Sequence, residues 1–298
     1  MQNPAEKTVN NVVPTSMVPV LAGGGTRLPA HVGVVAALDE LHVGYDHIVG
    51  VSGGSIVAAL KAAGKSIDEI YSLALEVDFR QFRGYSPYQL LFHGGLSSGA
   101  RFETWFDQQI GGMRFRDLPI NLHVVATDVQ TGLPVIFDNQ LTPDEKVASA
   151  VRCSMGIPLL FAFKLKHGQV LVDGSILAEE ALRRDWCNDG TPVCLFRIRA
   201  EKERAGRQPG RPPLLPAFIV MLIRSFMTTV SREFINDTYW HSTIVINSGA
   251  VSPIEFGMSK EQKAKLYREG YETTMKYIPA KFMKFGARQQ LFQESSPA

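Results

Sequence analysis

Residues 50–54, Gly-Val-Ser-Gly-Gly, constrain the fold of this chain more than any other segment. They follow the apolar pair Ile48 and Val49 and precede the apolar run 56–60, a pattern that predicts a strand, a tight turn and a helix. The outer glycines suit a turn that leaves no room for Cβ atoms. Ser52 would stand at a helix N-terminus, as in the nucleophile elbow G-x-S-x-G, although the pentapeptide also fits an ordinary loop.

The segment before this turn shows the same alternation of strand and helix. Residues 18–22 are apolar and are broken by the glycines at 23–25, and residues 30–41 carry apolar side chains at helical spacing. Strands and helices joined by such short connections are typical of a parallel sheet. The sequence therefore predicts an α/β fold with a mainly parallel central sheet flanked by helices.

Further elements are expected along the rest of the chain. Helices are predicted at 67–75, 101–110, 146–153 and 260–277, and strands at 122–128, 134–137, 170–172, 193–199 and 243–247. Residues 82–92 are aromatic and are expected to be irregular. We expect one domain over residues 17–280, between a flexible N-terminal leader (1–16) and a polar C-terminal tail (281–298).

The composition argues against some classes of protein. A formal net charge of +2 is too small for a typical nucleic-acid binder. Cys153, Cys187 and Cys194 lack metal-ligand spacing and are expected to be reduced, as in a cytoplasmic protein. We find no secretory signal and no apolar run of about 18 residues, so the sequence predicts no membrane-spanning helix.

A serine nucleophile needs an oxyanion stabiliser and a base, and two further segments suit these roles. The glycines at 23–25 lie on the first strand-to-helix turn, where backbone N–H groups and the helix dipole favour negative charge. A nucleotide-binding loop would need a third glycine or Gly-Lys-Ser/Thr, which are absent. Arg27 could bind a lipid phosphate. Asp173 ends a predicted strand and is either the base or part of an Asx-turn.

Three motifs in order carry a resemblance to a known family. They are Gly-Gly-Gly-Thr-Arg at 23–27, Gly-Val-Ser-Gly-Gly at 50–54 and Asp-Gly-Ser at 173–175. Residues 126–137 and 150–158 (Ala-Val-Arg-Cys-Ser…Ile-Pro) are similar to further segments of that family. Over about residues 17–280, the chain resembles the patatin-like phospholipases.

The resemblance implies a three-layer α/β fold and a Ser–Asp dyad that works without histidine. It makes Ser52 the nucleophile and Asp173 the general base. It also implies an oxyanion hole formed by Gly23, Gly24, Gly25 and Arg27. The elbow motif would include Gly50 and Gly54. The implied reaction is hydrolysis of acyl esters in phospholipids or other acyl lipids, without a cofactor or metal ion. The protein would be cytoplasmic and would associate transiently with a membrane surface.

Two positions depart from the family pattern. Leu28 stands where the family usually has glycine, which bears on the backbone of the oxyanion turn. Ser175 stands where glycine or alanine is usual, and because serine is also small we expect little effect.

Two alternative functions stay open from the residues alone. A Ser-His-Asp triad of an α/β-hydrolase esterase would use His241, together with Asp237 or Asp185. A regulated lipid- or nucleotide-binding effector with little turnover is the alternative of another class.

Two apolar segments also have two interpretations each. Residues 212–230, inside a possible lid at 200–236, form either an interfacial lid or a core helix. Residues 85–92 either line an acyl pocket or simply pack.

Overall fold

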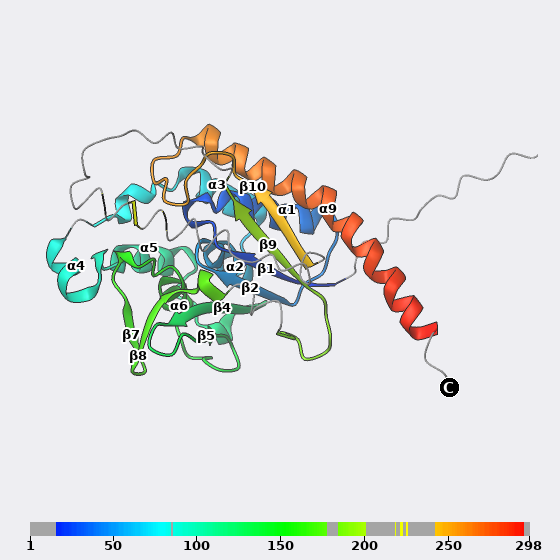
Figure 1. Cartoon of the computed structure of the whole chain (residues 1–298), viewed down its shortest axis with the longest axis horizontal. Coiled ribbons are helices and arrows are strands. Elements are labelled where there is room, and N and C mark those ends of the chain that lie inside the picture. Colours follow the sequence, from blue (N-terminus) through cyan, green and yellow to red (C-terminus); the bar gives the residue numbers. More distant parts are fainter. Residues whose placement is uncertain are drawn as a thin grey trace, which may run out of the picture.

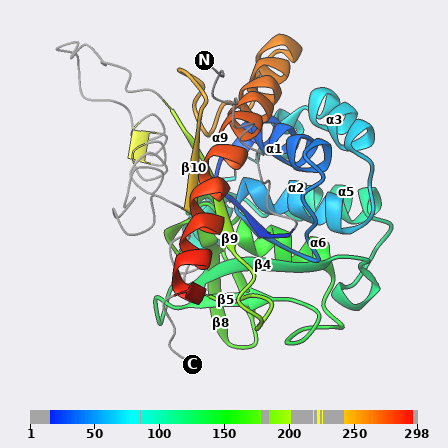
Figure 2. The same ribbon diagram turned by 90° about the vertical axis from the view of Figure 1, so that its right-hand side faces the viewer.

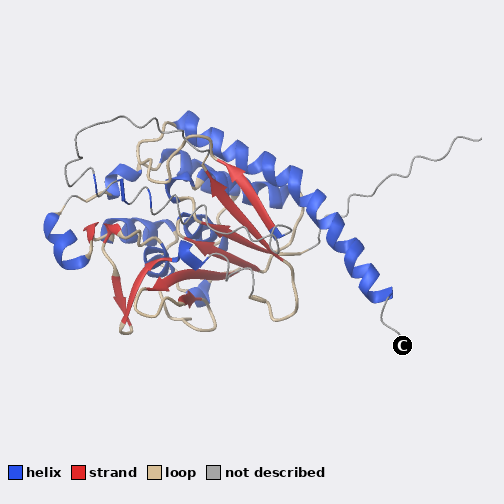
Figure 3. Cartoon of the chain, viewed as in Figure 1, coloured by secondary structure: helices blue, strands red, loops and turns tan. Residues whose placement is uncertain are grey.

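The computed structural model describes residues 16–84, 86–177, 184–200, 218, 221, 222, 225 and 242–294 of the 298-residue chain. They form a mixed α/β fold in which helices flank a central sheet (Figure 1, Figure 3). This is the fold class that the alternation of strands and helices predicts.

The central sheet has eight strands within the described ranges. In chain order they are β1 (Val18–Ala22), β2 (His47–Val51), β4 (Asn121–Asp128), β5 (Pro134–Phe137), β7 (Lys164–Lys166), β8 (Gln169–Asp173), β9 (Val193–Arg199) and β10 (Thr243–Asn247). Across the sheet the order is β10-β9-β1-β2-β4-β8-β7, with β5 paired to β4. The first five of these are mutually parallel, whereas β8 runs antiparallel to β4 and β7 runs antiparallel to β8. The parallel strands end at one edge of the sheet, which we call the carboxyl edge.

The helices are α1 (Pro29–Glu40), α2 (Gly53–Ala62), α3 (Ile67–Glu76), α4 (Pro87–His93), α5 (Ala100–Gln109), α6 (Val147–Ser154) and α9 (Lys260–Glu294). Short 3₁₀ segments are η1 (Gly25–Arg27), η2 (Phe79–Phe82), η3 (Phe115–Asp117) and η4 (Gly174–Leu177). A separate two-stranded sheet pairs β3 (Gly95–Ser97) with β6 (Leu159–Phe161). Figure 2 shows α1, α2, α3, α5 and α6 gathered on one face of the central sheet.

Most predicted elements are present, and the differences are local. β9 and β10 have the predicted bounds, but the short strands β3, β6 and β7 were not predicted. The helix α4 lies in the aromatic segment that we expected to be irregular. Helix α9 continues to Glu294, far into the segment expected as a polar tail. The predicted leader, apart from Ser16, lies outside the described residues.

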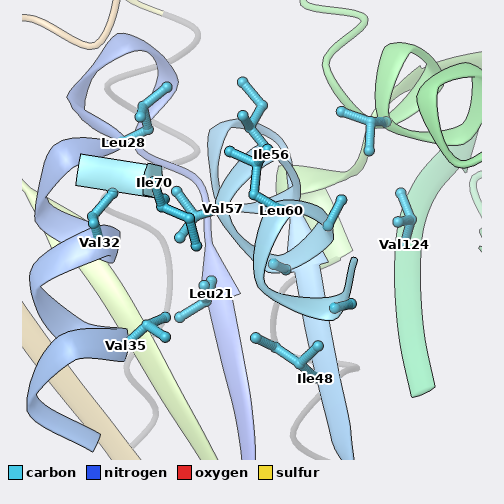
Figure 4. Packing of buried hydrophobic residues seen from close by; sticks show 14 of the residues in the cluster. Leu21, Leu28, Val32, Val35, Ile48, Ile56, Val57, Leu60, Ile70 and Val124 are labelled. Atoms are coloured by element: carbon cyan, nitrogen blue, oxygen red, sulfur yellow. The ribbon is translucent and has the colours of Figure 1, made fainter. Parts of the chain in front are cut away.

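The main core fills the space between the sheet and its helices (Figure 4). There Leu21 of β1 meets Val32 and Val35 of α1 and Ile56 of α2. All five residues of β1 are buried, because a central parallel strand is covered on both faces. Its alternate residues belong to a second cluster on the opposite face, which includes Trp186.

The described part of the chain offers no helix with both the length and the apolarity needed to cross a bilayer. The three cysteines are free thiols, and Cys153 and Cys194 are buried. Burial raises the pKa of the Cys194 thiol to about 12, so this thiol is un-ionised at neutral pH.

Candidate active site

The elbow predicted at residues 50–54 joins β2 to α2, and Ser52 stands at its tip. Ser52 has φ 53° and ψ −131°, a left-handed backbone conformation that is uncommon for a residue other than glycine. A Cβ atom on Gly54 would lie 2.1 Å from the carbonyl oxygen of Leu21, and one on Gly50 would clash with the first turn of α2. Close packing therefore requires both glycines, and the strained serine has the conformation of a nucleophile elbow.

Asp173 is the last residue of β8, and its carboxylate contacts Ser52. The Oγ of Ser52 donates a hydrogen bond of 2.6 Å to Asp173 Oδ2. The backbone N–H of Ser175 donates one of 2.8 Å to Asp173 Oδ1, so the carboxylate also closes an Asx-turn. Ser52 and Asp173 are each 1% exposed. Burial raises the pKa of Asp173, although the hydrogen bonds from Ser175 and Ser52 act in the opposite direction.

Ser154, at the end of α6, fixes the elbow from the other side. Its Oγ accepts a hydrogen bond of 2.8 Å from the Ser52 N–H and donates one of 2.6 Å to the carbonyl oxygen of Val125 in β4. Ser154 is fully buried, so water does not compete for these bonds. The sequence placed Ser154 in a segment that resembles the family, but no local signal pairs two serines 102 positions apart.

The glycines at 23–25 lie beside the elbow, but their N–H groups differ in availability. The Gly23 N–H donates to the carbonyl oxygen of Val51 at 3.0 Å, so it is already engaged. Among the described residues, the N–H groups of Gly24, Gly25 and Gly53 have no backbone acceptor. A Cβ on Gly53 would lie 2.8 Å from the Gly25 nitrogen, so the two turns are in contact. These three N–H groups are the ones available to an oxyanion.

Arg27 supports the glycine turn from within the protein. Its side chain is 1% exposed, Nε donates to the Gly24 carbonyl oxygen at 3.0 Å, and Nη1 donates to Ser248 Oγ at 2.9 Å. Burial lowers the pKa of Arg27 to about 10, which still leaves it charged at neutral pH. His31 lies 3.2 Å from the Gly23 carbonyl oxygen through Nε2, and burial lowers its pKa to about 4, so it is neutral. The guanidinium thus contacts the turn's backbone rather than the pocket that Ser52 lines.

An apolar pocket opens beside Ser52 and includes about 430 Å³ of space, part of it open to solvent. Its lining residues come from both glycine turns, η2, α5, the segment after α6, β6 and the segment before α9: Gly25, Thr26, Ser52, Gly53, Phe79, Phe82, Phe102, Met155, Ile157, Phe161, Pro253 and Phe256. Aromatic and aliphatic side chains predominate, and such a lining fits a hydrocarbon chain.

A family model described as patatin-like phospholipase matches residues 20–182, which include the glycine turn, the elbow and Asp173. The chain belongs to the patatin-like phospholipase family.

The chain is also similar to curated proteins. An uncharacterized NTE family protein of Mycobacterium tuberculosis is 33% identical over 180 residues, which is 59% of this chain and 47% of that protein. The chain thus spans about half the length of that relative. An uncharacterized protein of Acanthamoeba polyphaga mimivirus is 27% identical over 274 residues, 87% of this chain and 92% of that protein.

Among solved structures, VipD from Legionella pneumophila has a TM-score of 0.60 at 18% identity, covering 90% of this chain and 67% of VipD. The type III effector ExoU has a TM-score of 0.52 at 16% identity, covering 91% of this chain and 54% of ExoU. At these identities the likeness concerns the fold.

The two departures from the patatin-like pattern have physical explanations. Leu28 has φ −50° and ψ −25°, an ordinary right-handed conformation that needs no glycine. Its side chain is 3% exposed and packs in the main core (Figure 4). Ser175 contributes its backbone N–H to Asp173, and every residue except proline supplies that donor.

The residues of the alternative triad are only partly within the described ranges. His241 and Asp237 lie outside them, and Asp185 accepts a hydrogen bond from Gly190 in its own loop. Ser52 already has a carboxylate partner, Asp173. Of the possible lid at 200–236, only positions 200, 218, 221, 222 and 225 are described.

Three of these lid positions carry large apolar side chains, and all three are exposed: Phe218 by 45%, Met221 by 57% and Leu222 by 43%.

A histidine pair that the sequence did not predict lies at the opposite edge of the sheet, with His123 buried and His47 half-buried. His47 Nδ1 is 2.9 Å from His123 Nε2, and His123 Nδ1 is 3.2 Å from Asp138 Oδ2. His47 begins β2, whereas the elbow follows its end, so this chain of hydrogen bonds is remote from Ser52. In the described ranges no group of three His, Cys, Asp or Glu side chains is arranged to hold a metal ion.

Proposed function

We propose that this protein is a lipid acyl hydrolase of the phospholipase A type, which cleaves fatty-acyl esters of phospholipids through an acyl-serine intermediate. The observation that carries the proposal is the 2.6 Å hydrogen bond between Ser52 and Asp173 at a strained elbow beside an apolar pocket. Family membership supports lipid hydrolysis in general, and the pocket supports a substrate with a long hydrocarbon chain.

The first half of the reaction acylates the serine. Ser52 Oγ attacks the ester carbonyl carbon while its proton passes to Asp173 Oδ2. The carbonyl π electrons move onto oxygen, and the tetrahedral intermediate carries one negative charge. When it collapses, the ester C–O bond breaks and the leaving alcohol takes the proton from Asp173. The products of this half are the acyl-serine and a lysolipid.

The second half releases the fatty acid. A water molecule gives a proton to Asp173 and attacks the acyl carbon. Collapse of this second intermediate breaks the bond to Ser52 Oγ, which takes the proton back. The pKa of Asp173, raised by burial, makes it a stronger base than an ordinary carboxylate, and this supports both proton transfers.

The negative charge in both intermediates needs hydrogen-bond donors. We assign this role to the backbone N–H groups of Gly24, Gly25 and Gly53, which have no backbone acceptor among the described residues. Gly23 and Arg27 act through the shape of the turn. The Gly23 N–H is engaged by the Val51 carbonyl oxygen, and Arg27 donates to Gly24 and Ser248 through Nε and Nη1 without lining the pocket. The remaining nitrogen of Arg27, Nη2, is buried with no hydrogen-bond partner among the described residues. With a carboxylate base and these N–H donors, the reaction requires no metal ion. We place the protein in the cytoplasm, in transient contact with membranes.

The decisive experiment compares wild type with three variants: Ser52→Ala, Asp173→Asn and His241→Ala. Each is incubated with phospholipid vesicles in the presence of EDTA, and released fatty acids and lysolipids are measured by mass spectrometry. We expect wild type and His241→Ala to release both products, and the other two variants to lose at least about a thousandfold in rate. Full activity of Asp173→Asn would refute the dyad, and loss of activity in His241→Ala would favour the triad.

A further inference from the structure

Helix α4 is well formed at both ends and yet buries none of its seven residues. Ser86 Oγ accepts a hydrogen bond from the Gln89 N–H at its start, and Gly94 ends the helix in a left-handed conformation. Tyr88 is 63% exposed, Leu91 77% and Phe92 61%. A seven-residue helix is marginal in water, and its stability usually comes from burying an apolar face. Since α4 has such side chains and no buried face, it is suited to contact something outside the chain.

Both ends of α4 are attached to walls of the acyl pocket. Before the helix, Phe82 lines the pocket, and its carbonyl oxygen accepts a hydrogen bond of 3.1 Å from Ser97 Oγ. After the helix, β3 pairs with β6, whose Phe161 also lines the pocket. Figure 1 and Figure 3 show α4 projecting from the end of the molecule toward which the parallel strands point. The exposed apolar helix therefore stands at the rim of the pocket.

The charged side chains in the segment from η2 to the start of α5, which contains α4, are of one sign, although Asp78 and Glu103 flank this segment. Residues 79–102 contain three arginines and His93 but no aspartate or glutamate. Arg80 is paired with Asp78. The Arg83 side chain is exposed, and its guanidinium lies 4.8 Å from the ring centroid of Phe256, a residue that lines the pocket. Arg101 is exposed at the start of α5. Such a cationic border complements the negative surface of a membrane that contains anionic lipids.

We propose that α4 is the element by which this protein docks on an anionic lipid bilayer, with Tyr88, Leu91 and Phe92 inserted among the lipids and Arg83 and Arg101 facing the headgroups. Docked in this way, the pocket would open toward the bilayer, and an acyl chain would reach Ser52 along an apolar rim. This path to Ser52 rests on the proposed function, but the docking itself requires no turnover.

The test measures vesicle binding in the full-length Ser52→Ala background, where no lipid is consumed. Co-sedimentation is measured with vesicles of phosphatidylcholine and phosphatidylglycerol and with vesicles of phosphatidylcholine alone. We expect tighter binding to the anionic vesicles. Changing Leu91→Glu and Phe92→Glu together should weaken this binding roughly a hundredfold, about tenfold for each side chain.

The matched control is Leu141→Glu. Leu141 is 61% exposed, like Phe92, but it lies in the turn after β5. In this turn Asn139 hydrogen-bonds to Asn121 at the start of β4, so Leu141 lies away from the carboxyl edge. The Leu141→Glu variant should bind anionic vesicles as tightly as the Ser52→Ala protein from which it is made. Thermal melting verifies that each variant folds. A Phe92→Trp variant should show a blue-shifted fluorescence change on vesicles that its parent lacks.

Three results would overturn the proposal. The first is undiminished vesicle binding by the Leu91→Glu, Phe92→Glu variant. The second is equal binding to neutral and anionic vesicles, which would contradict the anionic surface. The third is a dimer in size-exclusion chromatography that this double change converts to monomer, since α4 would then be covered by a second copy of the chain. Because hydrolysis enters none of these measurements, failure of the docking is distinct from failure of the catalytic proposal.

Discussion

Replacing Ser154 by alanine should damage the elbow more than its remote position in the sequence suggests. The change removes the hydrogen bonds to the Ser52 N–H and to the Val125 carbonyl oxygen. The Ser52 N–H is left buried without an acceptor, which costs about 1–3 kcal/mol. The carbonyl oxygen loses one bond, worth about 1 kcal/mol. We therefore expect the free energy of unfolding to fall by about 2–4 kcal/mol, which lowers the melting temperature by roughly 3–6 °C in a chain of this size.

The same change should lower kcat more than it affects KM. Ser154 holds the nitrogen of Ser52, and a displacement of about 1 Å at a reacting atom typically costs about a hundredfold in rate. Because Ser154 does not line the pocket, KM should stay within about twofold. Steady-state kinetics on a p-nitrophenyl acyl ester, together with thermal melting, provides both measurements.

Ser55→Ala is the matched control. Ser55 Oγ donates a bond of 2.6 Å to the Ser52 carbonyl oxygen, but this oxygen also accepts from the Ser55 N–H at 2.9 Å. Its removal thus leaves no buried group without a partner and should cost only about 1 kcal/mol. Wild-type kcat and melting temperature in Ser154→Ala, or an equal loss in Ser55→Ala, would refute the reasoning.

Three further predictions concern the same site. Asp173→Asn should abolish hydrolysis but melt above wild type. Burial raises the pKa of Asp173, so the wild-type protein loses stability as pH rises from about 4 through that raised pKa. Melting curves over a pH series check this, and a difference in melting temperature that stays constant with pH would contradict it. Leu28→Gly should unfold more easily by about 3 kcal/mol in urea without a gain in kcat, because it removes a core side chain from a turn that needs no glycine. Gly54→Ala should destabilise the chain by several kcal/mol and abolish activity, because its Cβ would lie 2.1 Å from the Leu21 carbonyl oxygen. Normal expression of an active Gly54→Ala protein would contradict this and show that the turn can open.

The elements that could be predicted from the sequence are those with a strong local pattern. β1, β9 and β10 are apolar runs ended by glycine or polar residues, and the elbow has glycines at fixed positions. The strands β3 and β6 have three residues each and exist because they pair with each other, with paired residues 64 positions apart in the chain, which no local pattern contains. For α4 a signal was present, since Ser86 precedes it, Pro87 is its first residue and Gly94 follows it. The aromatic composition of the segment obscured that signal.

The direction in which a side chain points is harder to predict than its identity. Arg27 was expected at the oxyanion hole by resemblance, and its identity alone cannot distinguish a guanidinium in the pocket from one behind the turn. The buried contacts with Gly24 and Ser248 decide this, and Ser248 lies 221 positions away. Ser154 has the same difficulty, because its role depends on the exact packing of α6 against β4.

The strand direction of β8 explains why Asp173 is buried. From the sequence, Asp173 was expected at the end of a strand beside the elbow, as in a parallel sheet. In the structure β8 runs antiparallel to β4 and pairs only with the last three residues of β4, from Asp128 back to Ala126. The chain thus enters at the carboxyl edge and runs inward, and Asp173 ends the strand beneath the elbow rather than at the solvent-exposed rim. Burial raises its pKa for this reason, so the topology itself gives Asp173 the stronger basicity that the proposed dyad without histidine would require.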